Sequence, residues 1–358
     1  MPQDAVQVKK AAGDLSRYIG LLAETGRGSV SGQSVRFPEI ADCAKASSSE
    51  PVIILNSDDE TSLKNGFSWR ARPERVEIYG ESGRGLCNGI YSFLSALGIS
   101  WPSPGMEKLP VSSSNNSTAP AQRNSQGFSL ALDGVNEPSK YSEGDIADVF
   151  SRRFFPAGRR ELKYIQKNGE AFAAWAARRR YDTVIFPLAC FASRNKRKIQ
   201  LLSGFFAEYG ISLEAGGRDF SALVPRNNFF LHSDCFRMEE GRRNKDHHFC
   251  PTNPGTMEII RREGEKLFRA AEGIKVFHLW QDKDAPDAWC SCPTCRAFTP
   301  QEQYRIAVSA AADVLAAVNP GAVISFYEKS GEEINIPLRK NLFCMEKIPE
   351  EKELKSII

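Results

Sequence analysis

The chain has 358 residues, of which 41% are hydrophobic and 25% charged, and its formal net charge is +3. This composition is typical of a globular protein, and the length favours two domains. The balanced charge gives no electrostatic reason to expect binding to nucleic acid or to a membrane surface, and no apolar run approaches the roughly 18 residues of a membrane span. The first residues lack an apolar signal-peptide core, which leaves open a cytoplasmic chain or an exported one whose leader has been removed.

Residues 1–110 are predicted to form a small α+β domain. Apolar residues recur at helical spacing through residues 2–25 and again through 85–97, where Gly98 follows as a helix stop. We expect this domain to be structural and to pack on the rest through the second helix or the segment around Trp101. Three short apolar or alternating stretches between the helices are typical of strands: 51–55, 67–72 and 75–79.

A polar segment rich in Ser, Asn and Pro, residues 111–127, is interpreted as a linker. Residues 128–358 then alternate predicted strands with predicted helices, which indicates a parallel sheet with helices outside it. About six such units are present, against the eight of a closed (β/α)₈ barrel, so a barrel here would be truncated. The expected strands are 128–133, 183–188, 211–215, 229–231, 275–280, 323–327 and 341–345, and the expected helices are 160–180, 196–209, 254–271 and 301–318.

The stretch from Lys275 to Arg296 concentrates chemically active residues. A buried-looking strand over 276–280 is followed directly by Asp282 and Asp284. Parallel α/β enzymes place their chemistry at the carboxyl ends of strands, so these acids are candidates for a site. The alternative is that they are turn formers or helix caps, which is the common use of acids in such loops.

Four of the nine cysteines have informative spacing. Cys290, Cys292 and Cys295 lie within six residues, and Cys250 precedes a predicted helix earlier in the chain. Tetrahedral structural zinc takes four sulfur or nitrogen ligands at short spacings, with His247 or His248 as alternatives to Cys250. A disulfide is the equal rival in an exported protein. Four sulfur ligands would leave no open position, so a catalytic zinc is not expected.

Two stretches resemble known families. Residues 76–110 are similar to the N-terminal domain that precedes the catalytic barrel in bacterial α-glucuronidases and β-hexosaminidases. Residues 248–327 resemble the uncharacterised bacterial family called domain of unknown function 4838, a glycosidase-like barrel. The first likeness rests on Gly89, Tyr91, Phe93, Leu94, Leu97, Gly98, Trp101 and Pro104, and the second on Phe249, Cys250, Asn253, Pro254 and the Trp-Cys-x-Cys-x-x-Cys run that begins at Trp289.

The resemblance implies a (β/α)₈ TIM-type barrel and a carbohydrate ligand, with no cofactor required for catalysis. Glycoside hydrolysis uses two carboxylates, one of them protonated, on either side of the scissile bond. We expect Asp282 or Asp284 as the acid and Glu328 as base or nucleophile, with Glu346 in reserve. The Asp-Glu pair of β-hexosaminidases and the acid glutamate of α-glucuronidases are absent here, because the chain has Asp282-Lys283-Asp284 instead.

Several further residues are expected to contact a sugar. Flat aromatic rings cover the apolar face of a pyranose, which makes Trp289 and Tyr327 candidate platforms, whereas Trp280 within its strand is expected in the core. Asp133 and Glu214 are strand-end acids that could bind hydroxyl groups. A non-catalytic carbohydrate-binding protein is the rival to a hydrolase, and an interaction protein built on a zinc knuckle is a third reading.

Overall fold

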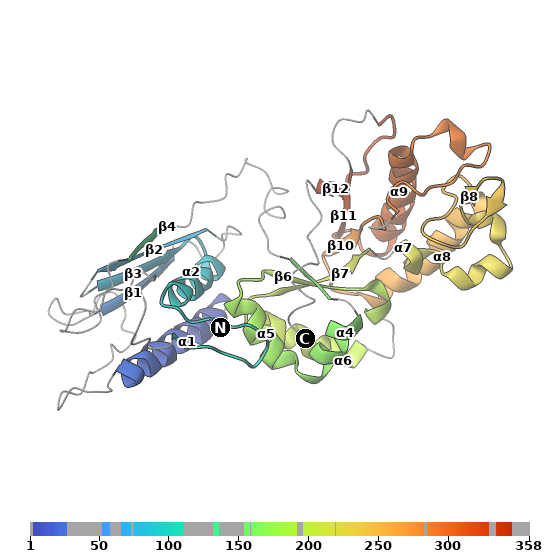
Figure 1. The fold of residues 1–358 in the computed structure, drawn as a ribbon. Helices are drawn as coiled ribbons and strands as arrows, with labels where there is room; N and C mark the ends of the chain where they lie inside the picture. Colours follow the sequence, from blue (N-terminus) through green and yellow to red (C-terminus); the bar gives the residue numbers. More distant parts are fainter. Residues whose placement is uncertain are drawn as a thin grey trace, which may run out of the picture.

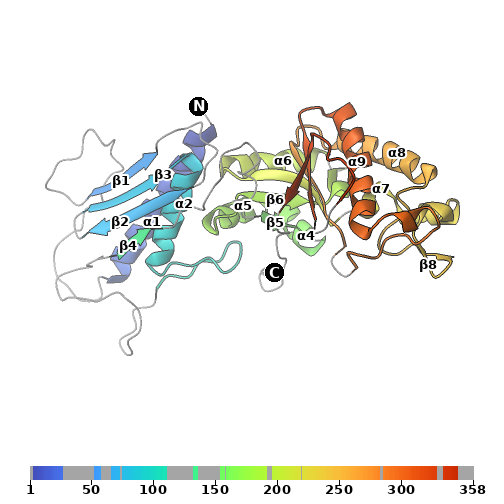
Figure 2. The same ribbon diagram turned by 90° about the horizontal axis from the view of Figure 1, so that it is seen from above.

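The computed structural model describes residues 3–26, 52–57, 66–72, 75–110, 132–135, 154–157, 159–191, 196–218, 220–282, 285–328 and 334–345. Two large sheets organise them and lie next to each other along the molecule (Figure 1; Figure 2). A third, small sheet pairs β8 (Met238–Glu239) with β9 (Arg242–Arg243). The mixture of helices and strands, with a parallel sheet as its larger part, confirms the predicted α/β class. Among the described residues, no helix is both long and apolar enough to cross a membrane.

The N-terminal sheet has four strands in the order β1-β3-β2-β4. β1 and β3 are parallel, whereas β2 runs antiparallel to both β3 and β4. Two helices lie on the same side of this sheet, with α2 between the strands and α1 (Figure 1). The elements are α1 (Gln3–Gly26), β1 (Val52–Ser57), β2 (Phe67–Arg72), β3 (Arg75–Gly80), α2 (Gly83–Ala96) and β4 (Leu132–Val135).

The Gly-rich turn before α2 lets the helix begin directly against the sheet. Ser82 caps the helix by accepting a hydrogen bond from the Gly85 backbone N–H at 3.0 Å. A Cβ atom on Gly80 would lie 2.0 Å from the backbone nitrogen of Leu86, and one on Gly89 would lie 2.8 Å from a methyl group of Ile78. Glycine at these two positions therefore allows the close approach of helix and strand.

The second sheet has six parallel strands in the order β12-β11-β10-β7-β6-β5, so its own strands follow one another across the sheet in chain order. Helices lie in each connection between successive strands of this sheet from β5 to β11, as parallel pairing favours. The strands are β5 (Phe154–Pro156), β6 (Thr183–Phe186), β7 (Ser212–Gly217), β10 (Val276–Leu279), β11 (Val323–Tyr327) and β12 (Leu342–Met345). The helices are α4 (Arg159–Lys167), α5 (Gly169–Arg178), α6 (Lys196–Glu208), α7 (Phe220–Leu223), α8 (Pro254–Ala270) and α9 (Pro300–Val318).

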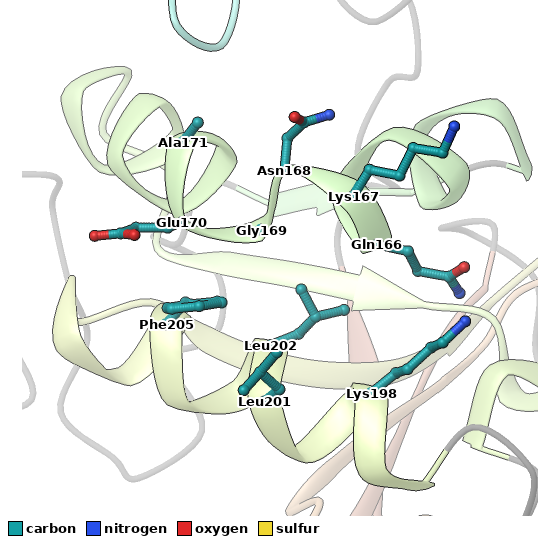
Figure 3. A pocket seen from close by; sticks show the side chains of 10 residues that line it. All are labelled: Gln166, Lys167, Asn168, Gly169, Glu170, Ala171, Lys198, Leu201, Leu202 and Phe205. Carbon is teal, nitrogen blue, oxygen red and sulfur yellow. The ribbon is translucent and has the colours of Figure 1, made fainter.

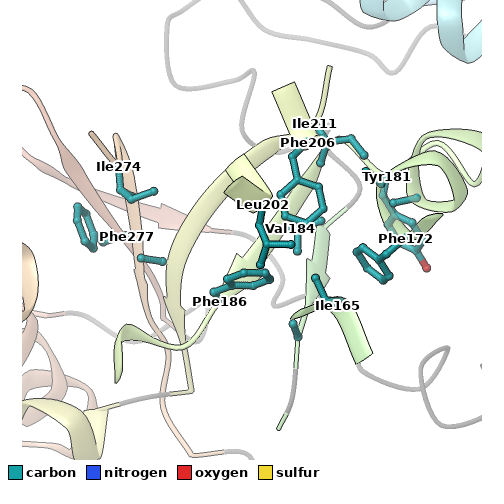
Figure 4. Close-up of a cluster of buried hydrophobic side chains, with 14 of the residues drawn as sticks. Ile165, Phe172, Tyr181, Val184, Phe186, Leu202, Phe206, Ile211, Ile274 and Phe277 are labelled. Atoms are coloured by element: carbon teal, nitrogen blue, oxygen red, sulfur yellow. The ribbon is translucent and has the colours of Figure 1, made fainter. Parts of the chain in front are cut away.

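Alternate residues of this sheet enter two separate cores. The outer core packs strand aromatics against helix aromatics, as in the contact of Phe186 with Phe206 (Figure 4). Phe277 packs against Phe268 of α8 in the same way. The inner core gathers the residues of opposite orientation: Ile185, Trp280, Phe343 and Met345. A sheet with both faces buried is what a parallel α/β architecture demands. The core position expected for Trp280 is confirmed by its 2% exposure.

The N-terminal helices and the Trp101 segment join the two sheets. The Trp101 carbonyl accepts a hydrogen bond from the indole N–H of Trp175 on α5 at 3.0 Å. Arg84, in the first turn of α2, is buried and donates to a carboxylate oxygen of Asp182 at 3.1 Å. The expected packing through the Trp101 segment is therefore confirmed.

Three predicted elements differ from those observed. Residues 128–133 were expected in the parallel sheet, but β4 pairs with β2 in the N-terminal sheet, since strand propensity does not specify a partner. Residues 229–231 belong partly to the 3-10 helix η4 (Arg226–Phe230) instead of a strand. The single helix expected over 160–180 is divided at Asn168 into α4 and α5. β5 was not predicted, because three residues give too little periodicity.

Candidate active site at the strand ends

Asp282 and Glu328 follow neighbouring strands of the parallel sheet. β10 and β11 pair in parallel register, and each acid comes shortly after its strand ends. The carboxyl ends of parallel strands lie at one edge, so both acids belong to the same edge of the sheet. Asp284 and Glu346, the other two acids expected there, lie outside the described residues.

Asp282 is partly open to solvent and has a histidine partner. Its carboxylate oxygen Oδ2 lies 3.1 Å from Nδ1 of His247, and its side chain is 41% exposed. The His247 backbone has a φ of +33°, a conformation that residues other than glycine rarely adopt. Arg226 holds this backbone by donating hydrogen bonds to the carbonyls of Asp246 and His247. Strained backbone of this kind persists where surrounding contacts enforce it and is common at active sites.

Glu328 is held by an arginine. Nε of Arg305, from α9, lies 2.6 Å from one carboxylate oxygen, and Nη2 donates to the other. The side chain of Glu328 is 10% exposed and that of Arg305 is 14% exposed. Arg305 also donates to the Ile336 carbonyl at 2.8 Å. Tyr327, directly before Glu328, is half-buried, and its backbone N–H donates to the Tyr304 hydroxyl at 3.3 Å. This carboxylate is thus part of a nearly buried, bidentate ion pair.

Glu214 lies inside the sheet and not at its open edge. Its Oε2 is 2.7 Å from Nε2 of His278, whose Nδ1 is 2.5 Å from the Ser325 hydroxyl oxygen. The indole N–H of Trp280 donates to the same hydroxyl at 3.2 Å. These residues come from β7, β10 and β11 and are almost fully buried. They form a polar network that links three strands below the edge where Asp282 and Glu328 lie.

Trp289 and Asp133 occupy different surroundings from those expected. Trp289 is 5% exposed, and its ring stacks on His248 with centroids 4.3 Å apart, so it presents no open face as a sugar platform. The polar residues next to Trp289 in the sequence gave no indication that its side chain would be buried. Burial also lowers the pKa of His248 to about 4. Asp133 belongs to β4 of the N-terminal sheet, opposite Arg70 in the backbone register.

The four cysteines with informative spacing come together beside this edge. Cys250, Cys290, Cys292 and Cys295 are all buried, and their sulfur atoms lie within 4.8 Å of one another. The separations from Cys250 are 3.8 Å to Cys292 and 3.6 Å to Cys295, well above the roughly 2.05 Å of a disulfide bond. The convergence of the four cysteines that the sequence predicted is therefore confirmed. Hydrogen bonding with neighbouring thiols, mainly that of Cys250, raises the pKa of Cys295.

A pocket of about 330 Å³ lies on the helical layer, between α6 and the junction of α4 with α5 (Figure 3). No strand-end residue lines it, and Glu170 is its one carboxylate, so it cannot supply a pair of acids. The lining residues are Gln166, Lys167, Asn168, Gly169, Glu170, Ala171, Lys198, Leu201, Leu202 and Phe205.

Sequence reasoning missed the partners of the two strand-end acids. The sequence suggests His247 only as a zinc ligand. The available signal for a second role is its position in a His-His pair, after charged residues and before Cys250. Arg305 lies within a helix whose amphipathic pattern gives no sign of an ion pair with the next strand. Both contacts depend on tertiary packing, which spacing along the chain does not reveal.

No protein-family model and no curated protein matches this sequence. Among solved structures, the chain is similar to the chitobiase of Flavobacterium johnsoniae, with a TM-score of 0.51 and 12% identity over 93% of this chain and 49% of that one. It is also similar to an exo-β-N-acetylglucosaminidase from Vibrio harveyi (TM-score 0.44, 12% identity, 82% and 48% covered). A third similarity is to a GH138 enzyme targeting pectin rhamnogalacturonan II (TM-score 0.49, 12% identity, 95% and 36% covered).

The chitobiase similarity shows a shared fold and extends over nearly the whole chain. This chain spans about half the length of the first two structures, 49% and 48% respectively. The chain thus shares its α/β fold with the chitobiase, while activity does not follow from fold alone.

Proposed function

We propose that this protein is a glycoside hydrolase in which Asp282 is the acid and Glu328 the base or nucleophile. The observation that carries the proposal is the contrast between these two acids at neighbouring strand ends: one is half-open beside a histidine, the other is paired with an arginine. Acid and base are assigned where environments separate two carboxyl groups in this way.

The six-stranded sheet is proposed to be the larger part of a (β/α)₈ barrel. Its strands are neighbours in chain order, and its two faces carry separate cores, as the wall of a barrel does. The likeness to a chitobiase over 93% of the chain supports this architecture. In such a barrel, the edge carrying Asp282 and Glu328 is the face on which enzymes bind their substrates.

The chemistry assigned to these residues is proton transfer and attack across a glycosidic bond. Asp282 gives a proton to the leaving-group oxygen, and the ring of His247, 3.1 Å from its carboxylate, is placed to return one. Glu328, held in its pair with Arg305, activates water or attacks the anomeric carbon. Asp284 and Glu346 follow the ends of β10 and β12 and are the alternative acid and base.

The substrate is proposed only at the level of a glycan. The chitobiase likeness suggests amino sugars, but the Asp-Glu pair of β-hexosaminidases is replaced by Asp282-Lys283-Asp284, which removes the residue basis for substrate-assisted chemistry. Tyr327, half-buried at the end of β11, is the proposed aromatic contact for the sugar.

The test is a screen of aryl glycosides and natural glycans with the whole chain, followed by comparison of Asp282→Asn with Asp313→Asn. Asp313, on α9, forms an exposed ion pair with Arg339, so its variant controls for the loss of a carboxylate. Hydrolysis that is lost only in Asp282→Asn supports the proposal. Glycan binding without hydrolysis of any substrate would instead favour a carbohydrate-binding protein.

A further inference from the structure

We propose that Cys250, Cys290, Cys292 and Cys295 bind one structural Zn²⁺ ion. The four sulfur atoms come from two segments separated by α8 and β10, and they converge within 4.8 Å of one another. Within the residues described, this is the group of cysteines in which each side chain can offer a ligand to one common point.

The separations between sulfur atoms match a single tetrahedral ion. Zinc–sulfur bonds of about 2.3 Å place the corners of a tetrahedron about 3.8 Å apart. Cys250 is 3.8 Å from Cys292 and 3.6 Å from Cys295. An iron–sulfur cluster would divide the thiolates between two or four irons and so spread the sulfurs more widely.

Two hydrogen-bond donors lie beside one of the sulfur atoms. The four side chains form a buried group of their own, with only Met238 packed against them among described hydrophobic residues. The Met238 backbone N–H donates to the Cys290 sulfur at 3.2 Å, and Arg243 approaches the same sulfur at 3.7 Å. Such donors offset the negative charge of four thiolates around one divalent cation. Binding would release the thiol protons to solvent.

The loop that carries three of the ligands is shaped by α9. The buried side chain of Gln303 accepts from the Cys290 backbone N–H at 3.0 Å and donates to the carbonyls of Cys290 and Cys295 at 3.1 and 3.2 Å. Contacts of this kind orient metal ligands and fix the path of the loop. Because sulfur would fill all four positions, the ion would serve structure and leave no place for substrate.

The ion would also fasten two segments beside Asp282. Cys250 lies three residues after His247, the partner of Asp282, and Cys290 directly follows Trp289, which stacks on His248. A metal at this point therefore joins both sides of the His248–Trp289 contact. The effect on catalysis rests on the proposed function, whereas the binding of metal does not.

The experiment measures metal in the purified whole chain by mass spectrometry of the elements, together with the absorption spectrum after replacement by Co²⁺. One zinc per chain and sulfur-to-cobalt charge-transfer bands of a tetrahedral site are expected. Cys292→Ser should lose most of the bound zinc. Cys87→Ser, which changes an equally buried cysteine on α2, should retain it.

If Cys292→Ser fails to fold, a measurement on the wild-type protein still tests the proposal. Four cysteines should resist a thiol reagent until a chelator is added, because zinc protects its ligands. Protein purified in zinc-containing buffer that holds no zinc, or that contains iron or disulfides among these four cysteines, would overturn the proposal. These outcomes do not depend on hydrolysis, so the failure of either proposal can be recognised separately.

Discussion

The ends of β10 and β11 carry one acid each, yet the two acids have different surroundings. Asp282 is 41% exposed and contacts the imidazole ring of His247. Glu328 is 10% exposed and gives both oxygens to Arg305, which remains charged at any ordinary pH. The sequence presents the two as equivalent strand-end acids, and packing by helix α9 and the loop before α8 makes them different.

This difference in burial should separate the effect of a substitution on turnover from its effect on folding stability. A carboxylate that is partly exposed can be replaced with little effect on folding, whereas one of a nearly buried ion pair cannot. The effects of replacing the two acids should therefore diverge in stability even if both reduce turnover.

The largest expected effect is on turnover in Asp282→Asn. Loss of a general acid should reduce kcat about 10²- to 10⁴-fold, because proton transfer contributes rate factors of that size. The unfolding free energy should change by less than about 1 kcal/mol, since the side chain is exposed and its pair is weak. Steady-state kinetics and urea unfolding measure the two quantities. Wild-type turnover in this variant would remove the acid assignment.

Glu328→Gln should instead lose stability as well as activity. Removing one partner of a nearly buried pair leaves Arg305 uncompensated, which should cost about 2–4 kcal/mol. Glu258→Gln is the matched control, because it breaks an exposed pair with Arg261 on α8 and should leave stability almost unchanged. Urea unfolding of both variants measures the difference. Equal stabilities would mean that burial of the Glu328 pair has no energetic consequence.

His247→Gln should give a smaller loss of turnover than Asp282→Asn. The amide can still donate a hydrogen bond to Asp282, but it cannot return a proton. We expect roughly a tenfold loss in kcat near neutral pH, a fraction of the factor that the acid itself supplies. A variant as inactive as Asp282→Asn would show that His247 does more than assist the acid.

The smallest effect is expected at Glu107, an arginine-held carboxylate far from the strand ends. Hydrogen bonds from Arg17, and secondarily from Tyr18, lower the pKa of Glu107 to about 2 from an ordinary value of 4.5. Because the folded-state pKa is lowered, this contribution is present above pH 4.5 and is lost as the pH falls toward 2.

Glu107→Gln should therefore remove less than about 1 kcal/mol at pH 7 and progressively less below pH 4.5. Unfolding free energies at pH 7 and pH 3 measure the change, and turnover should stay at the wild-type level. A larger destabilisation at pH 3 than at pH 7 would contradict the assigned direction of the shift.

Much of the fold could be predicted because its signals are local. The strand over 276–280, the helix after Pro300 and the cysteine spacing all appear in short stretches of sequence. The pairing of β4 with the N-terminal sheet could not be predicted, because a strand's partner is chosen by tertiary packing.

The candidate site divides in the same way. The place of Asp282 and Glu328 after neighbouring strands followed from the alternation of strands and helices. The burial of Trp289 did not, because its ring is covered by His248 and Phe220 from other segments of the chain.

The most direct test of Asp282 as the acid is the dependence of hydrolysis on the leaving group. Wild-type enzyme and Asp282→Asn are compared on aryl glycosides of one sugar whose phenols range from strongly to weakly acidic. Asp282→Asn should approach wild-type kcat/KM with the most acidic phenol, which departs without a proton, and fall about 10²-fold or more with the least acidic. An equal loss with every leaving group would contradict the assignment of Asp282 as the proton donor.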